Sequence, residues 1–112
     1  MIVAIPVSPD GQVGHAWGKA AVVAVAHASG GQVTSWTEHE VRWDLSHDAA
    51  GHGEHHARVV RFLREHEVTH VVADHMGEGM VRTLAQLHIQ VSRPEQLDAR
   101  AAVAALTQAG CP

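Results

Sequence analysis

The sequence has a single cysteine, Cys111, next to its C-terminal residue. One cysteine excludes an intrachain disulfide and a Cys-x-x-Cys site. Positive charge is also scarce, because 8 Lys and Arg stand against 12 Asp and Glu and the formal net charge is −4. No basic run occurs in the chain. We therefore expect no nucleic-acid partner, since phosphate binding needs clustered cations.

Long apolar segments are missing as well. The longest apolar run covers residues 20–26, far short of the roughly 20 residues that span a bilayer. The first six residues lack the basic start of a secretory signal. These absences predict a cytoplasmic protein with no membrane partner. A length of 112 residues predicts a single domain, residues 1–112.

Histidine is abundant by contrast: its 11 copies outnumber all Lys and Arg together. Histidine is the commonest metal ligand and the side chain that titrates near neutral pH. The positions of these histidines in the fold therefore decide what the sequence predicts about function.

The first half of the chain predicts three strands. Residues 2–7 form an apolar run closed by turn residues, which is typical of a buried strand. A loop over residues 8–18 follows. Residues 20–28 and 32–42 flank Gly30 and Gly31 and predict a β-hairpin, whose second arm alternates like a half-exposed strand. Residues 43–53 are polar without periodicity and predict a loop.

The second half alternates helices and strands. Apolar spacing predicts an amphipathic helix over residues 54–67, a strand over 69–73, a helix over 77–87 and a short strand over 89–91. Residues 92–95, Ser-Arg-Pro-Glu, match a capping box, which predicts the start of a C-terminal helix over residues 93–112. The order of elements predicts an α/β fold with βαβ units.

Histidines converge at one edge of this predicted sheet. In open α/β sheets, ligands bind outside the carboxyl ends of the parallel strands. The loop after the first strand, the loop entering the first helix and the loop after the fourth strand all reach that edge. They would bring together His15, His47, His52, His55, His56 and His75.

The densest part of this group is Gly51-His52-Gly53-Glu54-His55-His56. Its spacing would place His52 near His55 and His56 on one side of a first helical turn, which suits one metal or cluster. Gly53 lets the backbone approach a ligand, and the free N–H groups of a helix start favour an anion. A packed or idle surface histidine is the alternative at each single position.

The same residues resemble the dinitrogenase iron-molybdenum cofactor biosynthesis family. The resemblance lies in residues 2–7, in residues 10–20 with His15-Ala16-Trp17-Gly18, and in residues 51–56. It covers residues 1–92 as a family-like core and leaves out the C-terminal helix at 93–112. The family implies a ribonuclease H-like three-layer fold with a mixed five-stranded sheet, an antiparallel hairpin and flanking helices.

The resemblance also implies a binding role rather than catalysis. Its members bind or carry iron-sulfur or iron-molybdenum cofactor precursors, and a cofactor-assembly protein would be the partner. By position, His15, His52, His55 and His56 are the residues that would contact the cluster. The segment Asp74-His75-Met76-Gly77 departs from the family's glycine-rich turn and adds His75 as a further ligand.

Three other functions compete with a cluster carrier. A site rich in histidine and without thiolates also suits a single zinc, copper, nickel or iron ion. Asp74 and Glu54 near the histidines suggest a metal-dependent hydrolase, although the first strand has no carboxylate for a two-metal nuclease. A small regulatory interaction module whose histidines sense pH is the third alternative.

Overall fold

The computed structural model describes residues 1–45 and 52–109, with the backbone alone at residues 52–55 and 109. Five strands form one sheet in the order β3-β2-β1-β4-β5. Their bounds are β1 (Ile2–Pro6), β2 (Val22–Ser29), β3 (Gln32–Glu40), β4 (His70–Val72) and β5 (Gln90–Ser92). Antiparallel pairing joins β1 to β2 and β2 to β3, whereas β1, β4 and β5 run parallel. The predicted α/β fold with a mixed five-stranded sheet is confirmed.

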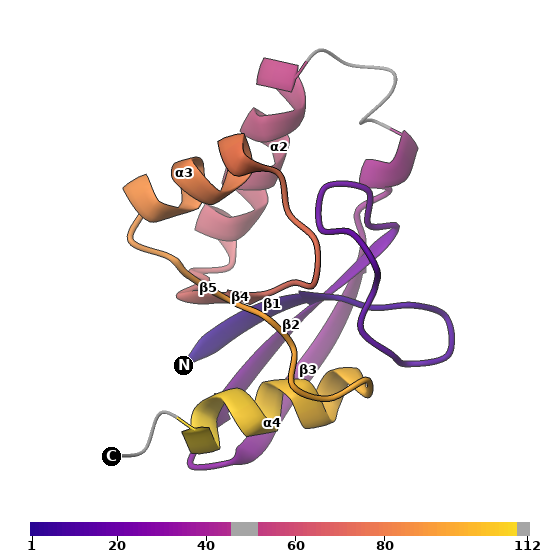
Figure 1. Cartoon of the computed structure of the whole chain (residues 1–112), viewed down its shortest axis with the longest axis vertical. Coiled ribbons are helices and arrows are strands. Elements are labelled where there is room, and N and C mark those ends of the chain that lie inside the picture. Colours follow the sequence, from indigo (N-terminus) through magenta and orange to yellow (C-terminus); the bar gives the residue numbers. More distant parts are fainter. Residues whose placement is uncertain (46–51, 110–112) are drawn as a thin grey trace.

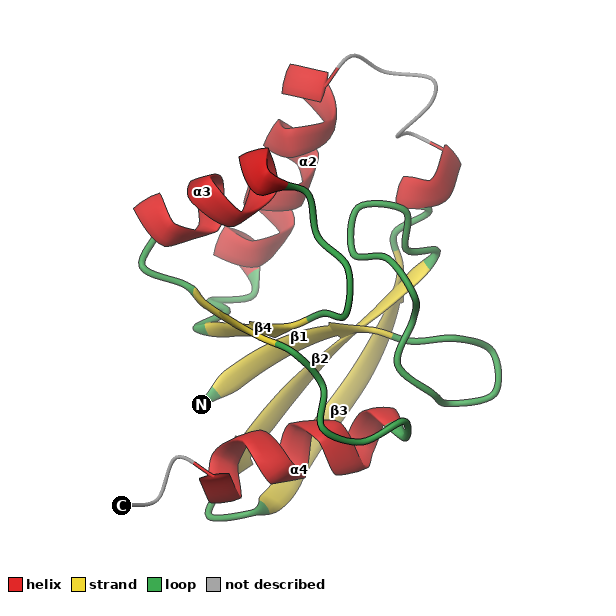
Figure 2. Ribbon diagram, viewed as in Figure 1, coloured by secondary structure: helices red, strands yellow, loops and turns green. Residues whose placement is uncertain are grey.

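Helices cover both faces of this sheet. Figure 1 shows α2 (His52–Glu65) and α3 (Glu78–Gln86) above it and α4 (Ala99–Ala109) below it. The same three layers are visible in Figure 2, where the strands lie between the helices. Along the chain, α2 connects β3 to β4 and α3 connects β4 to β5. Both helices therefore start near the carboxyl ends of strands that run in the same direction.

The alternation of side chains along the strands divides the core into two parts. Ala4 and Val71 face α2 and α3, where Leu63 and Leu84 pack on them. Their neighbours Val3, Ile5 and Val72 face α4 and pack on Val103. Successive side chains of a strand point to opposite faces, so a short apolar strand serves both parts of the core.

The predicted hairpin is confirmed at its turn. Gly30 and Gly31 have φ values of 57° and 82°, the left-handed region that glycine adopts without steric cost. Gly31 also donates a backbone hydrogen bond of 2.9 Å to the hydroxyl oxygen of Thr107 in α4. The turn is therefore tied to the helix below the sheet.

The predicted capping box is wrong. Ser92 pairs with Val72 as the last residue of β5, and its carbonyl oxygen accepts a hydrogen bond from Ala73 at 3.0 Å. The helix begins at Ala99 instead, where a carboxylate oxygen of Asp98 accepts a hydrogen bond from the Ala101 amide at 3.0 Å. Sheet pairing outcompeted a local capping motif, and an aspartate nearer the helix caps it instead.

The first long helix ends earlier than the periodicity predicts. Glu67 adopts a left-handed φ of 54°, and the amide of Val68 donates to the Leu63 carbonyl at 3.0 Å. This bond closes the end of α2 and returns the chain to the sheet. No helix in the described ranges is long and apolar enough to cross a bilayer.

Candidate functional site

The loop between β1 and β2 is fixed to three parts of the fold. The amide of Gly14 donates to the Pro6 carbonyl at 2.8 Å, and the amide of Val13 donates to the Leu97 carbonyl at 2.8 Å. The amide of Trp17 donates to the carbonyl of His75 at 3.0 Å, beside a parallel bridge that pairs Ala16 with His75. Because these bonds precede and follow His15, the backbone at His15 is held in place.

Two predicted site residues, His15 and His75, are brought together by this pairing. Their rings lie nearly parallel, at 5°, with centroids 6.1 Å apart. Both side chains are exposed. They come from the loops after β1 and β4, which are neighbouring parallel strands, as the predicted convergence requires.

Trp17 anchors the loop from below. Its side chain is fully buried, and its ring meets that of Trp43 edge to face with centroids 5.2 Å apart. Its indole N–H has no hydrogen-bond partner among the described residues. Packing of the apolar ring therefore holds Trp17 in place, rather than a side-chain hydrogen bond.

The beginnings of α2 and α3 touch through His56 and Gly79. The Cε1 atom of His56 lies 3.4 Å from the point where a side chain at position 79 would start. Gly77 precedes α3 in an extended conformation, and no side-chain hydrogen bond caps the helix. His75 is only four residues before Gly79, at most about 14 Å along the chain.

Much of the predicted histidine group lies outside the described residues. His47 is one such residue, and the side chains of His52, Glu54 and His55 are outside as well, although the backbone from His52 onward is helical. Gly53 contributes only its place in the first turn of α2. Among the described side chains, no group of three or more His, Cys, Asp or Glu residues could hold a metal ion.

Asp74 is exposed and lies to one side of the histidine pair. It lines a small cavity of about 210 Å³ with Val13 and Leu97, next to the entry of α4. The hydrolase alternative needs this carboxylate beside Glu54, whose side chain is not described. The predicted pairing of Asp74 with Glu54 therefore stays a prediction.

A second pair of histidines lies at the other end of α2. The rings of His39 on β3 and His66 after α2 have centroids 4.4 Å apart, and Phe62 packs against both at 5.5 and 4.6 Å. Burial lowers the pKa of His39, and the nearby His66 lowers it further. Burial also lowers the pKa of His70, which stands at the start of β4.

The order of elements in the sequence placed His15 and His75 at one edge of the sheet, but it did not indicate the pairing of His39 with His66. His15 and His75 are far apart in the chain, and so are His39 and His66. In each case sheet pairing or helix packing brings the two together. The adjacency of β1 and β4, whose following loops meet, is the feature that allowed the first pair to be predicted.

Comparisons with solved structures place the chain in a known fold. The protein PH0822 shares 20% identity, with a TM-score of 0.70 over 98% of this chain and 92% of that one. A protein from Methanocaldococcus jannaschii, described as a candidate dinitrogenase, shares 13% identity, with a TM-score of 0.71 over 97% and 89%. At these identities the likeness shows the fold alone. No curated protein matches the sequence.

A family model described as dinitrogenase iron-molybdenum cofactor matches residues 1–109. The match extends past residue 92, where the recognisable motifs stop, and takes in α4. This agrees with the structure, in which α4 packs on the face of the sheet opposite α2 and α3. The chain thus belongs to the dinitrogenase iron-molybdenum cofactor family, whose name associates it with binding or biosynthesis of that cofactor.

Proposed function

We propose that this protein binds an iron-sulfur or iron-molybdenum cofactor precursor and carries it to a cofactor-assembly protein without transforming it. The binding surface would combine His15 and His75 with the starts of α2 and α3. The observation that carries the proposal is the His15–His75 pair, because two exposed rings are held together at the sheet edge where ligands bind in α/β folds. Family membership supports the choice of ligand.

The chemistry of the donors fits a preformed cluster. A cluster brings its own sulfides, so the protein needs only a few terminal ligands, and imidazole binds iron. Two imidazole nitrogens at about 2.0–2.1 Å from one metal lie within about 4 Å of each other. Rotation of the exposed His15 and His75 side chains would bring their nitrogens to that separation. His52, His55 and His56 would complete the site from α2, with Gly53 leaving room for the cluster.

The start of α3 suits an anionic cargo. Gly77 and Gly79 keep bulky side chains away from the first turn of α3, and a helix start attracts negative charge. A carrier must release its cargo, so a small number of neutral ligands on an exposed surface is an advantage.

The strand order and the antiparallel hairpin support the ribonuclease H-like assignment that the family resemblance implies.

The test is cluster uptake by matched variants. Untagged protein is prepared without oxygen and incubated with ferrous iron and sulfide, with and without molybdate, and the bound elements are measured together with an absorption spectrum. His15→Ala with His75→Ala should lose most of the bound iron. The control, His27→Ala with His88→Asn, changes two exposed histidines elsewhere. Asparagine is used at position 88 because His88 has a left-handed φ of 61°.

Each result has a definite meaning. Iron with sulfide or molybdenum that is lost only in the His15 and His75 variant supports the carrier. Unchanged iron content and affinity in that variant would reject the proposed site. A single zinc, copper or nickel ion in place of iron and sulfide would favour a mononuclear site. Protein that takes up no metal would favour a regulatory interaction module.

A further inference from the structure

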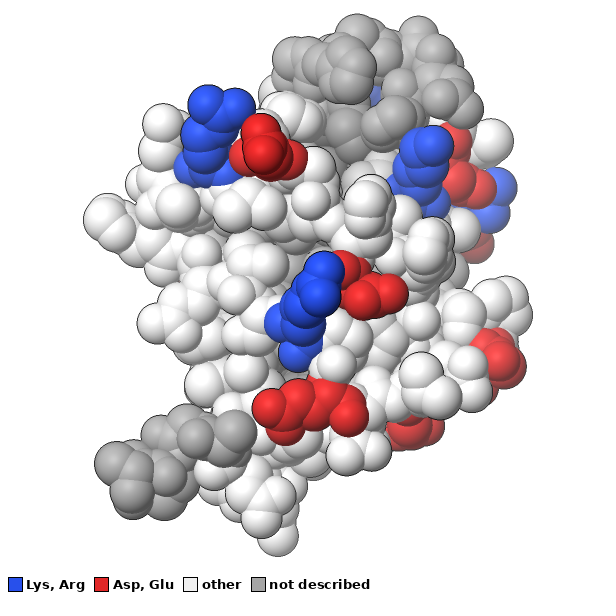
Figure 3. Space-filling view, viewed as in Figure 1, with Lys and Arg blue, Asp and Glu red and all other residues white. Residues whose placement is uncertain are grey.

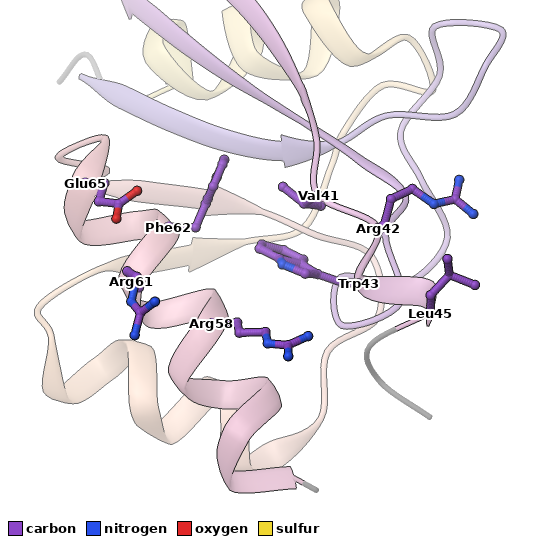
Figure 4. Close-up of a pocket in the computed structure, with 8 residues that line it drawn as sticks. All are labelled: Val41, Arg42, Trp43, Leu45, Arg58, Arg61, Phe62 and Glu65. Atoms are coloured by element: carbon purple, nitrogen blue, oxygen red, sulfur yellow. The ribbon is translucent and has the colours of Figure 1, made fainter. Parts of the chain in front are cut away.

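An open groove lies between α2 and the chain that leaves β3, away from the paired rings of His15 and His75. Its volume is about 500 Å³, within the range of small-molecule sites. Figure 4 shows its lining, which combines apolar side chains with three arginines. The lining residues are Val41, Arg42, Trp43, Leu45, Arg58, Arg61, Phe62 and Glu65.

Aromatic rings form the floor of the groove. Trp43 is 3% exposed, and Phe62 meets it edge to face at 87° with centroids 5.5 Å apart. Trp17 supports Trp43 from the core side. In Figure 4 the rings of Trp43 and Phe62 lie between α2 and the segment after β3. Because Trp43 is almost fully buried, it supports the half-buried ring of Phe62, which is the apolar surface that a flat ligand could cover.

Cations concentrate around this floor. The chain has only 8 Lys and Arg, yet three of its arginines line one groove, where Glu65 is the acidic residue among the described lining side chains. Arg58 and Arg61 stand three residues apart on α2 and so project from the same side of the helix. Arg58 extends toward Trp43 and Leu45 (Figure 4).

Neighbouring acids leave part of this charge uncompensated. Asp44 binds Arg42 at 3.1 Å and offsets the charge at the rim. Within residues 1–45 and 56–108, no carboxylate oxygen lies within 4.0 Å of the Arg61 guanidinium. On the face drawn in Figure 3, by contrast, the fully visible Lys and Arg side chains lie beside acidic ones.

We propose that this groove binds a small organic anion, a carboxylate attached to a flat apolar ring. A guanidinium matches a carboxylate with two parallel hydrogen bonds, and its plane stacks on aromatic rings. The ring of the ligand would cover Phe62 beside the edge of Trp43, and its carboxylate would reach Arg61. The net charge of −4 disfavours a nucleic acid as the occupant. The site uses none of the histidines of the proposed carrier surface, so the two proposals stand or fall separately.

The test compares three probes of matched shape and charge by nuclear magnetic resonance. 2-Naphthoate supplies ring and charge, 2-naphthalenemethanol the ring alone, and acetate the charge alone. Naphthoate should shift the Trp43 indole signal saturably and bind at least about tenfold more tightly than either of the other two. Equal binding of the neutral alcohol would overturn the proposal, and so would the absence of a saturable shift at Trp43.

Variants then locate the anion. Arg61→Gln should weaken naphthoate binding by about tenfold, to the level of the alcohol. Arg64→Gln, an exposed residue of the same helix outside the groove, is the control and should change binding less than twofold. Each variant is compared after its spectrum outside the groove matches that of the parent. Equal losses for Arg61→Gln and Arg64→Gln would show a general charge effect and overturn the assignment.

Discussion

The Cε1 atom of His56 lies 3.4 Å from the position that a side chain on Gly79 would occupy. This contact joins the first turns of α2 and α3, and it makes the exposed backbone of Gly79 part of the proposed binding surface. A distance of 3.4 Å is ordinary van der Waals contact, so a single methyl group fits there. A larger side chain at this position would have to displace the His56 ring.

Gly79→Ala should therefore raise the free energy of unfolding by about 0.5–1 kcal/mol, because glycine within a helix carries an entropic cost. Urea unfolding measures this change. Gly77→Ala is the matched control: position 77 precedes the helix, where glycine is preferred to alanine, and this variant should lose a few tenths of a kcal/mol. A loss of stability in Gly79→Ala would mean that His56 cannot accommodate the methyl group.

Gly14 is a glycine that the fold requires for its small size. A side chain there would begin 3.1 Å from the Cβ of the buried Pro6 and 3.4 Å from its backbone carbon. Gly14→Ala should destabilise the protein by about 1–3 kcal/mol, since the crowded atoms belong to a strand in the core. Because His15 follows directly, the variant should also bind less iron in the uptake experiment. Unfolding and iron content that match the parent would show that the loop can move without consequence.

The sequence predicted the architecture where local and long-range preferences agree. The apolar run of β1, the glycines of the hairpin and the amphipathic α2 each appear in the fold close to their predicted places. The prediction of a capping box at Ser92 was wrong, because Ser92 pairs with β4 as the last residue of β5. A motif read from four residues carries no information about which neighbouring strand will pair with it.

The same limit applies to the candidate sites. Adjacent loops could be inferred from strand order, which is why His15 and His75 were placed at one edge. The arginine groove could not, because Arg58 and Arg61 have the pattern of an ordinary solvated helix face. Only the packing of Trp43 beside Phe62 turns that face into the wall of a groove.

Arg42 holds an unusual backbone conformation. Its φ of 52° lies in the left-handed region, and the amides of Val41 and Arg42 both donate to the Ala21 carbonyl at 3.0 Å. Arg42→Gly should be more stable than Arg42→Ala by about 1 kcal/mol, because glycine adopts this conformation without steric cost. Thermal or urea unfolding of the two variants gives the difference. Equal stabilities would mean that the segment relaxes out of the left-handed region.

Stability should decline as the solution is acidified below the ordinary histidine pKa of 6.5. Burial lowers the pKa of both His39 and His70 in the folded protein. The unfolded chain therefore takes up protons first as the pH falls, and protonation favours unfolding. The full stability is present above pH 6.5 and is lost as the pH falls through the lowered values.

Urea unfolding at several pH values from about 8 to about 5.5 tests this dependence, because histidine is the side chain that titrates there. His39→Gln removes one of the two groups and should make the decline shallower. The same variant removes the positive charge that His39 presents to His66 when protonated. A decline as steep as that of the parent would mean that His39 takes no part in it.

Thr107 connects α4 to the hairpin turn beneath the sheet. Its side chain is 8% exposed, accepts a hydrogen bond from the Gly31 amide at 2.9 Å and donates to the Ala104 carbonyl at 3.0 Å. Thr107→Val keeps the shape but leaves the Gly31 amide without this partner, and it should cost about 1–3 kcal/mol. Thr37→Val on the exposed side of β3 is the control and should change stability by less than about 0.5 kcal/mol. Hydrogen exchange would show which part of the fold loses stability. The amides of α4 and of Gly31 should exchange faster in Thr107→Val. Equal protection in the variant and the parent would mean that α4 is held by its apolar contacts alone.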